Sequence, residues 1–104
     1  MANFPFHDLH SFKDYVCFVG TYSPDNFRLR EGFRAEEQWT LELAFEGLRH
    51  GLSIAVKEKG ELPVFEECRM LVETAHEYYR EGKKREGFFT LEQVRELLKK
   101  VPSQ

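Results

Sequence analysis

Residues 64–100, VFEECRMLVETAHEYYREGKKREGFFTLEQVRELLKK, decide the fold of this chain. Apolar residues recur in the first half at the 3.6-residue period of one helix face, and a second stripe follows after Gly82. Pro63 suits the first turn of the earlier helix. The pattern predicts two antiparallel helices over about 64–81 and 84–100. Their apolar positions are Phe65, Cys68, Leu71, Val72, Ala75, Tyr78 and Tyr79, then Gly87, Leu91, Val94 and Leu98.

The second helix has an alternative start. Thr90 and Gln93 have the spacing of a capping box, which would place the first turn after Thr90. The longer helix from Lys84 is favoured, because a tight hairpin then buries both apolar stripes.

This hairpin resembles one unit of the tetratricopeptide repeat. The resemblance departs from the family at Gly87, where the family prefers Ala, and no second copy lies roughly 34 residues upstream. It covers less than a third of the chain and is generic to helical hairpins. It would imply a role in binding a peptide or protein. The matching residues are Leu71, Ala75, Tyr78, Gly82, Gly87, Leu91 and Val94.

A third long helix is expected before the hairpin, over about 36–59. Glu36 and Glu37 stand at its start, which suits the helix dipole, and Gly60 follows as a cap. Gly51 lies in the middle, where it either breaks the helix or allows another helix to cross closely. One continuous helix is favoured. Its apolar stripe is Leu41, Ala44, Phe45, Leu48, Leu52 and Ala55.

The N-terminal third admits two interpretations. Residues 1–11 read as an extended arm that Phe4 and Phe6 anchor, followed by a helix over 12–22 capped by Ser11. A short helix over 24–31 would come next. Alternatively, Ser23–Asn26 is the turn of a β-hairpin, which would make the fold α+β. The favoured fold is all-α: one domain over residues 1–104, built as a compact bundle of four to five helices around antiparallel hairpins.

Composition bounds the class of protein. With 41% hydrophobic and 32% charged residues, 104 residues can bury one core. Net charge is −3, which argues against a general binder of nucleic acid or anionic membranes. Cys17 and Cys68 lie in apolar stretches and are expected to be buried and free. With no secretion signal or membrane span in view, we expect a cytoplasmic protein, and its compactness suggests a bacterial or phage source.

Few residues suggest chemistry, and no cofactor motif is present. His7, Asp8 and His10 could hold a metal, but exposed polar residues at a helix start are the more economical interpretation. Cys68 and His76 are eight residues apart on one helix, about 12 Å along its axis, too far for a nucleophile–base pair. We therefore expect no catalytic activity.

A basic set of residues could bind nucleic acid. Three arginines alternate with Phe27 and Phe33, a pattern that can stack bases or contact phosphates. The net charge favours a simpler interpretation, in which these residues are a solvated connector and a helix-hairpin turn. The basic set is Arg28, Arg30, Arg34, Lys83, Lys84 and Arg85.

Aromatic residues carry the favoured functional hypothesis. The chain holds ten Phe, four Tyr and one Trp, and several gather around the C-terminal hairpin. More apolar residues fall there than one stripe can hide, which predicts an exposed patch that binds a partner protein or a second copy of the chain. The interface candidates are Tyr78, Tyr79, Phe88 and Phe89.

Overall fold

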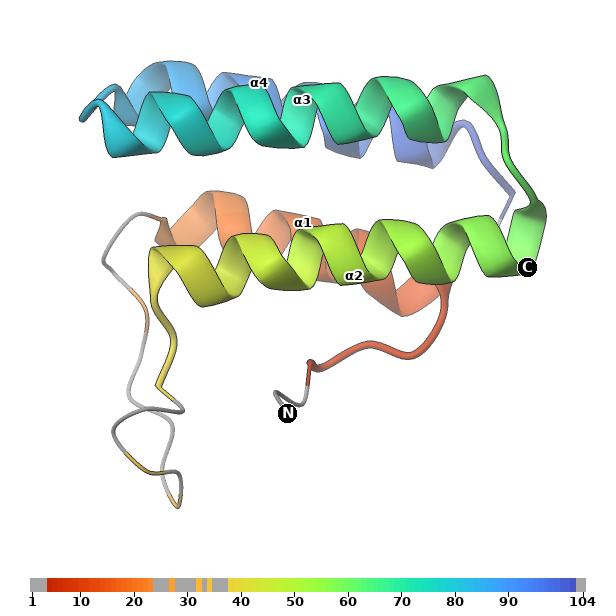
Figure 1. Ribbon diagram of the computed structural model, residues 1–104, viewed down its shortest axis with the longest axis horizontal. Coiled ribbons are helices and arrows are strands. Elements are labelled where there is room, and N and C mark those ends of the chain that lie inside the picture. Colours follow the sequence, from red (N-terminus) through yellow and green to blue (C-terminus); the bar gives the residue numbers. More distant parts are fainter. Residues whose placement is uncertain (1–3, 24–26, 28–31, 33, 35–37, 103–104) are drawn as a thin grey trace.

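Four helices follow one another up and down the bundle (Figure 1). The computed structural model describes residues 4–23, 27, 32, 34 and 38–102. Within these residues there is no strand, so the all-α prediction is confirmed and the α+β alternative is not. The helices are α1 (Leu9–Tyr22), α2 (Leu41–Lys59), α3 (Pro63–Arg80) and α4 (Lys84–Lys99).

The helices form two layers, with α3 and α4 packed over α1 and α2 (Figure 1). Contacts join α3 to α4, α1 to α4, α2 to α3 and α1 to α2, so each helix packs on two neighbours. Helices paired in this way bury one stripe each and leave the opposite face outside. The α3–α4 pair is therefore the antiparallel hairpin that the apolar spacing predicted.

The start of α1 differs from the prediction. The helix begins at Leu9, not at residue 12, and Asp8 is its N-cap in place of Ser11. The Ser11 backbone N–H donates to Asp8 Oδ1 at 2.9 Å, and the Asp8 N–H donates to Ser11 Oγ at 3.3 Å. Both residue types can cap a helix, and the earlier start carries Leu9 into the core. The extended arm is shorter than predicted, but Phe6 is buried and Phe4 packs on the core as expected.

Helix α2 begins five residues later than predicted. Thr40 is its N-cap, and its side chain accepts a hydrogen bond from the Leu43 N–H at 3.1 Å. A threonine that satisfies this free donor competes with helical continuation toward residue 36. The helix is unbroken at Gly51, and a Cβ there would overlap the ring of Phe12. Gly51 therefore marks the close crossing of α1 over α2 that the sequence left open.

The C-terminal helices match the predicted ranges within one residue. Pro63 occupies the first turn of α3, and Gly82, at φ 78°, makes the turn that leads to α4. Helix α4 begins at Lys84, so the alternative start at Thr90 is wrong. Thr90 is a buried helical residue whose hydroxyl donates to the Glu86 carbonyl at 2.8 Å. The short helix predicted over 24–31 lies outside the described residues, apart from Phe27, which is not helical.

None of the described helices has an apolar stretch long enough to cross a membrane.

Candidate functional site

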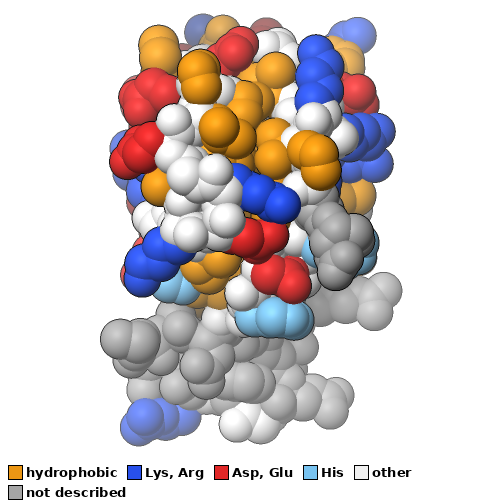
Figure 2. Space-filling model, turned by 90° about the vertical axis from the view of Figure 1, so that its right-hand side faces the viewer, with side chains coloured by type: hydrophobic (Ala, Val, Ile, Leu, Met, Phe, Trp, Pro, Cys, Tyr) orange, Lys and Arg blue, Asp and Glu red, His pale blue; other side chains and the backbone are white. Residues whose placement is uncertain are grey.

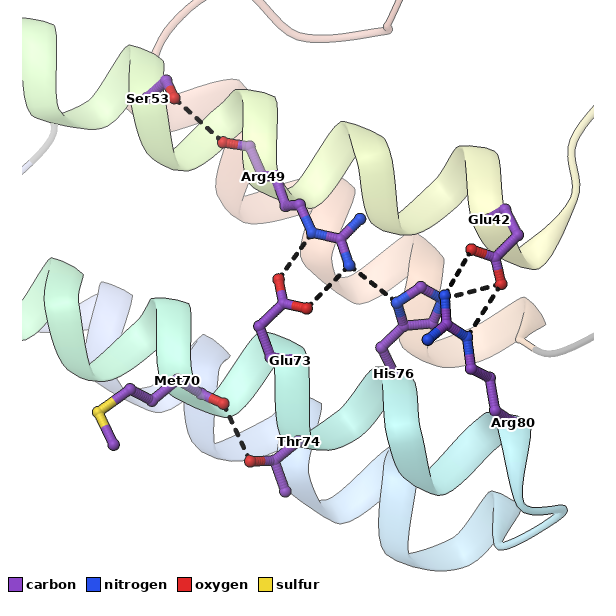
Figure 3. Close-up of polar contacts among 8 residues, drawn as sticks. All are labelled: Glu42, Arg49, Ser53, Met70, Glu73, Thr74, His76 and Arg80. Atoms are coloured by element: carbon purple, nitrogen blue, oxygen red, sulfur yellow. Dashed lines mark hydrogen bonds and ion pairs between the residues drawn. The ribbon is translucent and has the colours of Figure 1, made fainter.

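A network of charged side chains joins α2 to α3 (Figure 3). Arg49 on α2 binds Glu73 on α3 through two hydrogen bonds, of 2.7 and 2.9 Å. Arg80 on α3 binds Glu42 on α2 in the same two-pronged way, at 3.0 and 3.3 Å. His76 lies between the two pairs, with one ring nitrogen toward Arg49 and the other toward Glu42. The network spans the seam between the two helices.

The contacts of His76 define its tautomer. A guanidinium can only donate, so Nδ1 of His76 accepts from Arg49 Nη2, 2.9 Å away. The ring proton therefore lies on Nε2 and is donated to Glu42 Oε2 at 3.1 Å. The ring is 2% exposed and stacked on Phe45 at 4.5 Å between centroids. Because both ring nitrogens are engaged within the protein, His76 ties α2 to α3 and has no free nitrogen for a substrate.

The ion pairs lower the pKa values of the two carboxyl groups in this network. The Arg80 guanidinium, together with His76, lowers the pKa of Glu42 below its usual value. The hydrogen bond from Arg49 lowers the pKa of Glu73 in the same way. Both carboxylates are thus charged in the folded protein at neutral pH.

The histidines near the N-terminus do not converge on a metal site. Asp8 is committed to the cap of α1, and His7 Nε2 lies 3.5 Å from Asp8 Oδ2. His10 is exposed on the first turn of the helix. Among the residues that the structure describes, no three His, Cys, Asp or Glu side chains are grouped as metal ligands.

The two cysteines differ in their surroundings. Both are free, as predicted, but only Cys68 is buried. Cys17 is exposed because it lies off the buried stripe of α1, which runs through Phe12, Val16 and Val19. Burial raises the pKa of the Cys68 thiol to about 12, so it is protonated and unreactive at neutral pH.

The basic residues are only partly brought together. Arg28 and Arg30 lie outside the described residues, and Arg34 is exposed. Lys83 forms an ion pair with Glu81 at 3.4 Å. The other two, Lys84 and Arg85, line an open groove of about 580 Å³ between α1 and α4, together with Gly20, Thr21 and Phe88.

The predicted aromatic interface is split by the fold. Tyr79 is 4% exposed, because its ring packs between Phe45 and the Cα of Gly87, so its place among the exposed candidates is wrong. Tyr78 is half-buried. Phe88 and Phe89, in contrast, are 37% and 52% exposed, and their rings lie 5.8 Å apart.

Phe89 borders a groove of about 330 Å³ between α3 and α4. Leu71 and Leu97 supply further apolar surface, and Met70, at 65%, is the most exposed large hydrophobic residue in the described part of the chain. Met70 and the glutamates of the groove were not identified from the sequence as candidate site residues. Met70 could have been found, because it is an apolar residue outside the buried stripe of α3. The residues that line the groove are Glu67, Leu71, Phe89, Glu92, Gln93, Glu96 and Leu97.

A further apolar area lies at the end of the bundle where α2 ends and α3 begins. Figure 2 views this end and shows hydrophobic side chains in its upper half, over the α3 and α4 layer. Leu62, which is 38% exposed, belongs to this end and not to the α3/α4 groove.

Within the described residues, the geometry thus offers a structural polar network between α2 and α3 and an apolar groove between α3 and α4 that carboxylates border. Comparison of the chain with protein-family models, curated proteins and solved structures finds no match to any of them.

Proposed function

We propose that this protein is a cytoplasmic protein–protein interaction or regulatory module, whose binding surface is the α3/α4 face around Met70, Phe88 and Phe89. The observation that carries the proposal is the exposure of these three large apolar side chains, of which Phe89 borders the groove between α3 and α4. Apolar surface of this kind loses its contact with water when a partner covers it. The two free cysteines agree with a reducing compartment.

The border of the groove indicates the chemistry of the partner. Glu67 lies on its α3 side, and Glu92 and Glu96 lie on its α4 side. The floor between them is apolar. A fitting partner segment would place apolar side chains in the groove and Lys or Arg beside the carboxylates, because complementary charge sets orientation and excludes other partners.

The proposal can be tested with a library of random peptides displayed on phage. Peptides selected on the immobilised protein should combine apolar residues with Lys or Arg, and their binding is then measured by fluorescence anisotropy. The variant Phe89→Ser should weaken binding by about tenfold or more, as expected for the loss of an aromatic anchor.

Leu62→Ser is the matched control, because Leu62 is as exposed as Phe88 but lies outside the groove, as the residue that precedes α3. It should leave binding unchanged, and circular dichroism should show both variants folded. Selected peptides that bind Phe89→Ser as tightly as the unchanged protein would contradict the proposal.

A further inference from the structure

The outward face of α4 carries a stripe of four residues: Arg85, Phe89, Glu92 and Glu96. It lies opposite the buried stripe that runs through Leu91, Val94 and Leu98. Successive members are four, three and four residues apart, so they share one side of the helix. The stripe places the apolar Phe89 between charges of opposite sign, and charges that flank an apolar contact set the orientation of paired helices.

The spacing of this stripe reads the same from either end. In an antiparallel pair of such helices related by a two-fold axis, Arg85 of one copy lies opposite Glu96 of the other. Phe89 then lies opposite Glu92, and each contact occurs twice. A parallel pair would place Arg85 beside Arg85 and is disfavoured by like charge.

We propose that the partner of this face is a second copy of the chain, bound through an antiparallel α4–α4 contact. The inference rests on the proposed function and names its partner. It accounts for the exposure of Phe89, which lies next to the centre of the stripe, and the ring of Phe88 lies 5.8 Å from that of Phe89.

The charges at the two ends of the stripe are available for such a contact. Within residues 38–102, Arg85 forms no ion pair with a carboxylate, and its guanidinium lies 5.7 Å from the ring centre of Phe89. Among the described residues, the ion-pair partner of Glu96 is Lys99, three residues away, at 3.1 Å. Exposed pairs of this type contribute little to stability, so Arg85 of a second copy can compete for the carboxylate.

Light scattering on a sizing column, over a dilution series, gives the mass of the protein and of two charge-reversal variants. The measured mass of the unchanged protein should rise with concentration from 12.3 kDa toward twice that value. Arg85→Glu and Glu96→Arg, measured separately, should each weaken association by about tenfold or more, because each places like charges opposite one another twice.

An equal mixture of the two variants should regain the association of the unchanged chain. In the mixed pair, the introduced carboxylate faces the introduced guanidinium, while the unchanged Arg85 and Glu96 face each other. This rescue requires the antiparallel register, and a merely structural defect would not produce it. Lys57→Glu, on the exposed side of α2, is the control and should not change the mass.

A monomer at every concentration up to about 1 mM would overturn the inference, since weaker association has little significance in a cell. A dimer that the mixture does not restore would overturn it as well. In either case, peptide binding that depends on Phe89 would still support the proposed function, so the two failures are distinguishable.

Discussion

Gly20 and Gly51 are buried helical glycines whose surroundings differ. A Cβ on Gly51 would overlap the ring of Phe12, which is fully buried and has no room to move. A Cβ on Gly20 would lie 3.8 Å from Phe88, an ordinary contact. We expect Gly51→Ala to lower the free energy of unfolding by about 1–3 kcal/mol through overpacking. Gly20→Ala should raise it by about 0.5–1 kcal/mol through helix propensity.

Denaturation in urea measures both glycine variants, and each serves as the control of the other. Equal effects of the two substitutions would contradict the close crossing of α1 over α2 at Gly51.

Glu42 gives the stability of the protein a dependence on pH. Its pKa is lower in the folded state, chiefly because Arg80 binds the carboxylate. A lowered pKa contributes stability that is fully present above the unfolded value, 4.5, and is lost as the pH falls through the folded value. We therefore expect the unchanged protein to exceed Glu42→Gln in stability above pH 4.5.

The difference in stability between the unchanged protein and Glu42→Gln should become smaller as the pH falls below 4.5. Thermal unfolding at a series of pH values measures this difference. A difference that stays constant through the acidic range would argue against the Glu42–Arg80 pair.

At the scale of the element, the N-terminus of α2 depends on one side chain. Thr40 accepts the Leu43 N–H, which would otherwise lack a partner within the helix. Thr40→Ala should lower the free energy of unfolding by about 1 kcal/mol, whereas Thr40→Asn should retain most of the stability. Thr74→Ala is the matched control, because Thr74 is exposed within α3 and alanine is the better helix former there. If Thr74→Ala lowered the free energy of unfolding as much as Thr40→Ala does, loss of the cap would not explain the effect.

At the scale of the whole molecule, the two cysteines report on the opening of the bundle. A thiol reagent should modify exposed Cys17 quickly in the native protein. Cys68 is fully buried, and burial raises its thiol pKa to about 12, so its modification requires α3 to open from the core. Mass spectrometry should show one fast and one slow addition, and the slow one should accelerate in denaturant. Two fast additions would mean that α3 opens far more readily than its packing indicates.

The bundle as a whole follows from patterns that are local in the sequence. Helices α3 and α4 were predicted closely because Pro63 and Gly82 punctuate the chain beside long apolar stripes. The starts of α1 and α2 were not predicted correctly. Asp8 and Ser11 can both cap α1, and the acidic Glu36 suggested an earlier start for α2 than its N-cap Thr40 allows. At α1, the earlier start buries Leu9 in the core.

The sequence by itself determined the ranges of α3 and α4 and favoured an all-α fold over α+β. It placed Phe88 and Phe89 among four candidates for an exposed aromatic patch. Only the tertiary structure decided that Tyr79 is buried, because periodicity defines a stripe but not how much of it neighbouring helices cover. It alone joined His76 to Glu42, 34 residues away, and left Met70 exposed on α3. Such contacts depend on how helices pack in space, and no spacing along one helix contains that information.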